Sequence, residues 1–251
     1  MSRWSAEPLR IALAPGEVAL ARGARRHTVP AGRDATSLVP VLDAALADDA
    51  WQTTRVEVVL SQHFVRHVLT PPPGKPLSPV EEQALVAASL RDIYGDLAAH
   101  WAVRVYSQPP HAGLAGAAID AELAQALDAL LARRGFRRIA IRPFASVAAR
   151  RAPVRLEGWW VLVEPGWLSL FGGAQGCWQH VAGLPIDGRW QDTLPEWLER
   201  ERGSAAASIP NAVWLHASGM GAVVAPNDAR MRWHVLPHDA RLSGASALLA
   251  A

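Results

Sequence analysis

Two histidines stand four residues apart in an apolar stretch of the chain, which raises the question of a metal site. His63 and His67 lie in VEVVLSQHFVRHVL, residues 56–69. On a helix, residues four apart share one face, and zinc proteases use this spacing in the motif HExxH. Here the glutamate of that motif is absent and β-branched residues are frequent, which favours a strand. On a strand the two side chains would stand about 13 Å apart, too far to share one ion, so we expect no metal.

Cysteine chemistry is limited because the sequence contains a single cysteine, Cys177. One cysteine excludes an internal disulfide and a zinc site built from several thiolates. As a nucleophile, Cys177 would need a base, and His180 follows three residues later. The surrounding sequence is apolar and offers no third group to orient that histidine, so a small buried thiol is the favoured interpretation. The sequence contains no nucleophile elbow, P-loop or dinucleotide-binding glycine motif.

The composition describes a globular protein with an ordinary charge balance. Half of the 251 residues are apolar, so the chain can bury a core in one large domain or two moderate ones. The net charge of +2 does not demand nucleic acid as a partner. No apolar run reaches the roughly 20 residues of a membrane-spanning helix, and the start of the sequence lacks the layout of a secretion signal. We therefore expect a cytoplasmic protein.

Strands and helices alternate along the first half of the sequence. Residues 10–23 predict two strands around a turn at Pro15–Gly16, because both turn residues disfavour a helix. A helix is expected to follow Ser78, with Pro79 at its first position and Glu81 completing a capping box. The other elements expected here are helices at residues 36–49 and 120–135 and strands at 56–69, 101–108 and 137–144.

The second half repeats the opening of the first. Strands are expected within residues 159–184, broken at Pro165–Gly166 and at later glycines, and a helix follows at residues 190–203. Further strands at 211–221 and 231–237 precede an alanine- and serine-rich tail that we expect to fray. Both halves start with a strand, a Pro-Gly turn and a second strand, and both continue with helices and a strand. This pattern indicates a weak internal duplication.

The order of these elements carries a resemblance to a known family. Residues 56–72 are similar to a strand pair that ends in proline, and SPVEEQALVAASLRDIYGD, residues 78–96, stands for the helix after it. FRRIAIRPFASVAARR at 136–151 and WWVLVEPGWLSLFGGAQGCWQHVAGLPI at 159–186 continue the match. The chain thus resembles the PilM and GspL group, cytoplasmic proteins of the inner-membrane platforms of type IV pili and type II secretion.

The resemblance implies an α/β fold with two lobes, the actin-like fold of duplicated RNase H-like type. Residues 1–150 would form the first lobe and residues 151–251 a shortened second lobe. The segment between the helix at 190–203 and the strand at 211–221 is too short for the subdomain that covers the nucleotide in that fold. Because fold alone does not fix function, the site positions have to be compared one by one.

The nucleotide-binding positions of that fold are changed in this sequence. Members that bind ATP use two turns whose N–H groups approach phosphate, together with an acidic residue for Mg²⁺. In the first turn, ALAPGEVAL, Pro15 removes a donor and no aspartate precedes the glycine. In the second, VEPGWLSLFGG, a glutamate stands for the acid, but Pro165 and Trp167 replace small residues. The positions concerned, with a candidate adenosine loop, are Gly16, Glu17, Glu164, Gly166, Ser218 and Gly219.

These departures predict a degenerate member that binds no cofactor, with ATP and Mg²⁺ as the less favoured alternative. The resemblance then implies a non-catalytic cytoplasmic scaffold, attached to the inner face of a bacterial inner membrane by a PilN-like peptide of a membrane-anchored partner. Two other functions stay open. One is an ATP-dependent enzyme of the same fold, and the other is a binder of nucleic acid or anionic lipid that uses scattered arginine pairs such as Arg25–Arg26.

The expected partner surface combines charged and aromatic residues. The exposed face of the histidine strand would offer His63, Arg66 and His67 to the partner peptide. The sequence also contains eleven tryptophans, and two of them, Trp159 and Trp160, are adjacent and must point to opposite faces of one strand. One of the two is therefore expected to be exposed or in an interface. We expect Trp159 to belong to a surface for a partner or for a homodimer.

Overall fold

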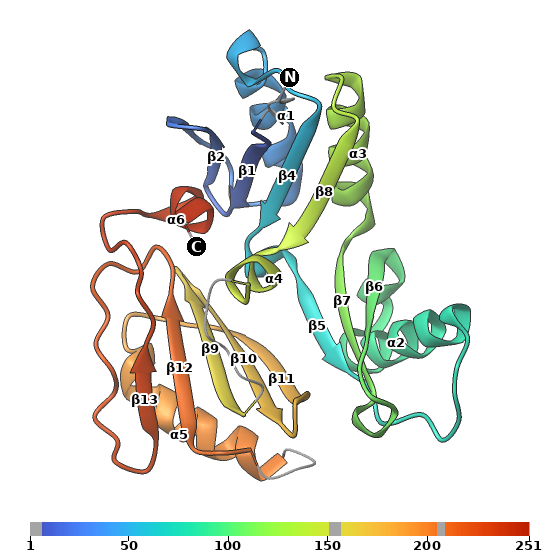
Figure 1. The fold of residues 1–251 in the computed structure, drawn as a ribbon, viewed down its shortest axis with the longest axis vertical. Helices are drawn as coiled ribbons and strands as arrows, with labels where there is room; N and C mark the ends of the chain where they lie inside the picture. Colours follow the sequence, from blue (N-terminus) through green and yellow to red (C-terminus); the bar gives the residue numbers. More distant parts are fainter. Residues whose placement is uncertain (1–6, 151–156, 205–208, 251) are drawn as a thin grey trace, which may run out of the picture.

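The computed structural model describes residues 7–150, 157–204 and 209–250 and arranges them in two lobes with an inserted subdomain (Figure 1). The boundary expected between residues 150 and 151 adjoins residues 151–156, which lie outside the described residues. The first lobe contains strands β1 (Leu9–Ala14), β2 (Glu17–Arg22), β3 (Arg25–Pro30), β4 (Arg55–Leu60) and β8 (Arg138–Pro143) and helices α1 (Ala35–Ala45), α3 (Ala121–Arg133) and α4 (Phe144–Ala148).

The second lobe follows the same plan with fewer helices. Its strands are β9 (Gly158–Glu164), β10 (Trp167–Ala174), β11 (Cys177–Pro185), β12 (Ala212–Ala217) and β13 (Arg232–Val235), and its helices are α5 (Trp190–Ser204) and α6 (Gly244–Ala250). The inserted subdomain contains β5 (Arg66–Leu69), α2 (Pro79–Tyr94), β6 (Trp101–Ser107) and β7 (Leu114–Asp120). The described residues also form the short 3-10 helices η1 (Asp49–Trp51), η2 (Gln62–Phe64), η3 (Gly95–His100) and η4 (Pro110–Ala112).

The two five-stranded sheets have one topology, which confirms the duplication predicted from the sequence. Their strand orders are β3-β2-β1-β4-β8 and β11-β10-β9-β12-β13. In each, the first three strands in the chain pair antiparallel and the last two run parallel to the first. The lobes differ between their last two strands. The first lobe carries the inserted subdomain and α3 there, whereas the second has a loop. The second lobe is therefore shortened as predicted, but the shortening lies between β12 and β13 and not between α5 and β12, where the sequence analysis placed it.

The strands of the first lobe sort their side chains by size onto two faces. In β1, Ile11 and Leu13 pack beneath α1 and α3, while Ala12 and Ala14 face the second lobe. In β2, Ala19 and Ala21 extend the same small-residue face. Side chains of a strand alternate between the faces of the sheet, so this pattern follows from the sequences LRIALA and EVALAR. The result is an alanine surface that lets other elements approach the sheet closely.

Both tryptophans of β9 are buried, and the prediction that Trp159 forms an exposed surface is wrong. Trp159 is 0% exposed and packs with Leu194 and Leu198 of α5. Trp160 is 2% exposed and lies in the cluster between the lobes, where its ring centroid is 5.1 Å from that of Phe171. The two side chains do point to opposite faces, but β9 is a central strand whose two faces are both covered.

The C-terminal segment forms a docked helix, so the prediction of a fraying tail is wrong. Helix α6 leaves the second lobe and packs against β1 and β2 of the first (Figure 1). Leu248 and Leu249 are buried there. The N–H of Ala245 donates to Glu17 at 3.0 Å, and Arg10 donates to the carbonyl of Leu249 at 2.5 Å. An acid at the N-terminus and a base at the C-terminus both complement the helix dipole.

Local sequence signals predicted the other elements well but missed two strands, β3 and β7. The capping box at Ser78 and Glu81 forms as predicted, with Pro79 at the start of α2. Strand β7 was not predicted, because its sequence LAGAAID is poor in the residues that favour strands. Its Gly116 lies so close to Val86 of α2 that a larger side chain would collide, so the small residues serve helix packing.

The docking of α6 yields a stability prediction. Replacing the buried Leu248 by alanine is expected to lower the free energy of unfolding by about 2–5 kcal/mol, because the cavity forms inside the cluster between the lobes. Chemical denaturation measures the loss. Leu97→Ala is the control, since Leu97 is 69% exposed and its truncation should change stability little. A Leu248→Ala protein as stable as the unsubstituted chain would contradict the docked helix.

Candidate functional site

Some of the positions predicted for a degenerate nucleotide site lie close together in the structure, and the start of α6 lies among them. Glu17 accepts hydrogen bonds from the N–H of Ala245 and the hydroxyl of Ser246, at 3.0 and 3.3 Å. A Cβ at Gly219 would lie 3.2 Å from the nitrogen of Gly244 and 3.4 Å from the ring of Pro165. The first turn and the loop after β12 therefore both approach Gly244, and the second turn approaches that same loop.

The other positions predicted for the nucleotide site, Gly16, Gly166 and Ser218, do not contact α6 in the same way. The N–H of Gly16 donates to the carbonyl of Gly32 at 3.0 Å, within its own lobe. Gly166 closes the β9–β10 turn with φ +80°, near the ring of His63. The cavity beside Ser218 has a volume of about 40 Å³, far below the 300–1,000 Å³ typical of small-molecule sites. A second cavity next to α6, of about 210 Å³, lies on the β2–β3 side and touches none of these glycine positions.

Glu164 is a buried carboxyl group at the junction of the lobes. It stands at the end of β9, and its Oε1 accepts from the N–H of Gln62 at 2.9 Å. Burial raises the pKa of Glu164 to about 7, although hydrogen bonds from Ser61 and Gln62 act in the opposite direction. Within the described residues, no group of three or more His, Cys, Asp or Glu side chains is placed to hold a metal ion. Glu164, which was expected at the place of the acidic residue that binds Mg²⁺, thus forms a hydrogen bond between the lobes.

The histidine stretch bends instead of forming one strand, so the predicted exposed strand face is wrong. Ser61 accepts from the N–H of His63 at 3.3 Å and starts the 3-10 helix η2, which separates β4 from β5. Ring nitrogen Nε2 of His63 is 2.9 Å from the carbonyl oxygen of Pro165, and the guanidinium of Arg66 lies 4.8 Å from the ring centre of Trp167. These side chains are half-buried against the second lobe.

His67 also contacts the second lobe. Its Nε2 is 2.8 Å from Oε1 of Gln62, and its ring meets the edge of Phe171 at 5.2 Å. Burial, with a smaller effect of Arg66, lowers the pKa of His67 to about 4, so the ring is neutral at pH 7. The two histidine rings have separate partners in the structure, and the absence of a bound metal stays a prediction.

Cys177 is a buried thiol, as the sequence favoured. It is 1% exposed, and its Sγ lies 3.8 Å from Nε2 of His111 in the inserted subdomain. His180, the base considered from the sequence, instead lies 3.0 Å from a carboxylate oxygen of Glu201. The thiol and His180 therefore do not form a catalytic pair.

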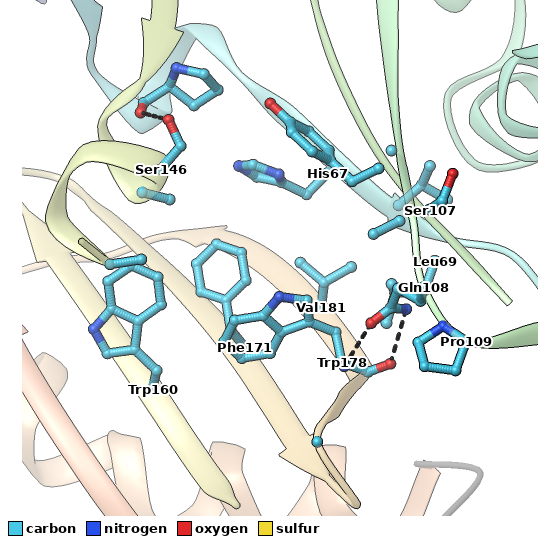
Figure 2. A pocket seen from close by; sticks show the side chains of 18 residues that line it. His67, Leu69, Ser107, Gln108, Pro109, Ser146, Trp160, Phe171, Trp178 and Val181 are labelled. Atoms are coloured by element: carbon cyan, nitrogen blue, oxygen red, sulfur yellow. Dashed lines mark hydrogen bonds between the residues drawn. The ribbon is translucent and has the colours of Figure 1, made fainter. Parts of the chain in front are cut away.

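An open aromatic pocket lies between the inserted subdomain, α4 and the second lobe (Figure 2). Its volume is about 360 Å³, and Trp160, Phe171 and Trp178 form one wall. His67 and Tyr106 approach from the inserted subdomain. Among the described residues that line it, none is Asp, Glu, Lys or Arg. The pocket therefore suits an uncharged, apolar group.

A second cavity of about 550 Å³ adjoins this aromatic pocket. Val68, Trp178 and Val181 line both, so the two cavities meet where β5 lies beside β11. No sequence pattern indicated this pair of cavities, because their walls come from segments far apart in the chain. The unusual tryptophan content of the second half was the one signal in the sequence that pointed to this region.

The buried Glu164 yields a prediction for the pH dependence of stability. Its pKa is higher in the folded chain than in the unfolded one, so its contribution is full below about pH 4.5 and is lost as the pH rises through 7. Half-buried His67 and buried His216 have pKa values lowered to about 4, so their contributions to stability have the opposite sign and are lost as the pH falls. The effect of Glu164 must therefore be measured as a difference between variants.

Glu164→Gln keeps a hydrogen-bond acceptor but cannot ionise. Between pH 4.5 and 7.5, the unsubstituted protein is expected to lose on the order of 3 kcal/mol of unfolding free energy relative to this variant. Denaturant titrations at a series of pH values measure the difference. Glu196→Gln, at an exposed position on α5, should follow the unsubstituted protein throughout. Parallel pH profiles for Glu164→Gln and the unsubstituted chain would show that the carboxyl group is not perturbed.

Comparison with known proteins supports the fold. No family model matches the chain, and no curated protein matches its sequence. The cytoplasmic domain of EpsL, an inner-membrane component of the type II secretion system of Vibrio cholerae, superposes with a TM-score of 0.56 at 13% identity, over 92% of this chain and 90% of that one.

Two further solved structures agree with this likeness. A Bacteroides thetaiotaomicron protein with an actin-like ATPase fold and unknown function has a TM-score of 0.53 at 10% identity, covering 87% of this chain and 85% of its own. The PilM–PilN type IV pilus biogenesis complex has a TM-score of 0.50 at 15% identity, covering 85% and 82%. With its two equivalent sheets, the chain has a two-lobed actin-like fold with a shortened second lobe.

Proposed function

We propose that the protein is a non-catalytic scaffold of a type IV pilus or type II secretion assembly platform and binds the cytoplasmic segment of a membrane-anchored partner. The observation that carries this proposal is a contrast between two clefts. Helix α6 occupies the space among the nucleotide-site positions, whereas the aromatic pocket at the inserted subdomain is open. The likeness to the EpsL and PilM–PilN structures supports the same kind of role.

The shape of the open site supports a peptide as its ligand. Two adjoining cavities of about 360 and 550 Å³ together extend along the junction of β5 and β11, which suits an extended segment better than one compact molecule. Aromatic rings such as Trp160 and Trp178 anchor apolar side chains at many protein interfaces. None of the described helices is long and apolar enough to cross a membrane.

The lining of the aromatic pocket indicates that Tyr106 contributes to partner binding. Tyr106 is 50% exposed and lines the aromatic pocket, so Tyr106→Ala should weaken co-purification of the platform partner in mild detergent by about tenfold, as truncated interface aromatics do. Leu97→Ala is the matched control, because Leu97 lies in the same subdomain, is exposed and lines neither cavity. Equal recovery with both variants would remove the pocket from the proposal, and no recovery of any platform protein would remove the proposal itself.

We also propose that the protein works without a nucleotide. The carboxylate of Glu17 is directed to the N–H of Ala245, and a side chain at Gly244 would already collide with it. Phosphate groups would meet that negative charge instead of free N–H donors. Isothermal titration with ATP and Mg²⁺ should therefore detect no saturable binding. A saturable heat at micromolar ATP would favour the alternative of an ATP-dependent enzyme.

A further inference from the structure

The side-chain amide of Gln108 binds the edge of the second-lobe sheet in the way that a peptide group would. Its Oε1 accepts from the N–H of Trp178 at 2.7 Å, and its Nε2 donates to the carbonyl oxygen of Trp178 at 3.3 Å (Figure 2). A neighbouring β-strand makes this same pair of bonds to one residue. Gln108 thus satisfies both backbone groups of Trp178 from outside the sheet.

The place of this contact is a sheet edge. Strand β11 ends the order of the second-lobe sheet, and β5 ends the order of the three-stranded sheet beside it. In the described strands these two edges lie close together without a hydrogen-bonded ladder between them. Edge strands carry unpaired N–H and C=O groups, which are a template for an added strand. Trp178 stands at the start of β11, where both cavities meet.

From this geometry we propose that Gln108 holds the place of a partner's peptide group, and that the partner segment binds as an extended strand on the edge of β11 at Trp178. The inference rests on the proposed function and specifies how the segment is recognised. The backbone of the segment replaces the amide of Gln108 on Trp178, and main-chain hydrogen bonds of this kind give affinity in strand addition.

The aromatic pocket specifies the side chain next to that backbone contact. Its described lining has no charged residue, and the wall of Trp160, Phe171 and Trp178 is apolar. His67 is neutral at pH 7 because burial lowers its pKa to about 4. The pocket therefore takes one bulky uncharged side chain, such as leucine, isoleucine or phenylalanine. A charged side chain would lose its hydration there without gaining a partner.

The experiment uses the full chain and a defined probe, the peptide acetyl-Thr-Val-Leu-Val-Thr-amide, at up to millimolar concentration. Binding is followed by the amide resonance of Trp178 in nitrogen-edited NMR spectra. The expected result is a saturable shift of that resonance in the unsubstituted protein. Gln108→Ala removes the competing amide, so it should tighten the peptide's Kd by about three- to tenfold, in line with the free energy of ordinary hydrogen bonds.

Controls separate this role from a structural clamp between subdomain and lobe. Gln125→Ala, at an exposed position on α3, should leave the peptide's Kd unchanged. Gln108→Met has a similar length without the amide and should behave as Gln108→Ala does, which keeps the test valid if the alanine variant folds poorly. Weaker or unchanged peptide binding in a folded Gln108 variant would overturn the proposal, because a clamp or a direct side-chain contact predicts that outcome.

A modified peptide tests the backbone itself. N-methylation of the central leucine and its neighbours removes the donors of the strand but keeps the side chains, and it should weaken binding at least tenfold. Unchanged binding of the methylated peptide would show side-chain recognition alone and overturn strand addition. If platform partners still co-purify while Gln108→Ala and the methylated peptide have no effect, this inference fails and the proposed function stands.

Discussion

The arrangement of the molecule depends on the apolar contact between its two lobes. The alanine faces of β1 and β2 meet α4, α6 and the inner face of the second-lobe sheet in one buried cluster. Small residues on one side and large ones such as Trp160 and Phe171 on the other let the elements approach without leaving a wide cleft. Because this contact is apolar, it persists without a bound ligand and sets the positions of both clefts.

The two short helices between the lobes have equivalent roles. Helix α4 leaves the last strand of the first lobe and packs toward Trp160 and Leu162 of the second, while α6 leaves the last strand of the second lobe and packs on the first. The last helix of each lobe therefore packs in the apolar cluster between the lobes (Figure 1). The two ends of α6 also make hydrogen bonds to charged side chains of the first lobe, Glu17 at the N-terminus and Arg10 at the C-terminus. These charges complement the helix dipole and add to the apolar packing of the helix.

The lobes are closed at the positions predicted for the nucleotide, and two cavities stay open at the inserted subdomain. Three features join the lobes beside the positions predicted for the nucleotide. They are the carboxyl group of Glu164, the bend at η2 and the cation–π contact of Arg66 with Trp167. The inserted subdomain reaches the second lobe mainly through β5 and the loop with Gln108 and leaves two cavities between them. A fold shared with a protein of actin-like ATPase fold thus has two adjoining cavities at its inserted subdomain here, in keeping with function residing in sites rather than in folds.

Sequence reasoning succeeded where the signal was local. The capping box of α2, the Pro-Gly turns and the repeated strand–turn–strand units depend on neighbouring residues, and all are present in the structure. Reasoning failed where burial by distant segments decided the outcome. Trp159 was expected at a surface because β9 is one strand, but α5 covers that side. The alanine- and serine-rich tail was expected to fray because chain ends are often poorly ordered, but packing against the first lobe stabilises it as helix α6.

By itself, the sequence determined the Pro-Gly turns and the repeated strand–turn–strand units, since turn chemistry and strand alternation are properties of short stretches, and the resemblance to the PilM and GspL group supplied the two-lobed actin-like plan. The tertiary structure alone decided what fills the cleft, that His63, Arg66 and His67 face the second lobe, and that Gln108 meets Trp178 seventy residues away. These features are contacts between segments distant in the chain. Their partners are chosen by the packing of whole elements, which no local pattern of residues encodes.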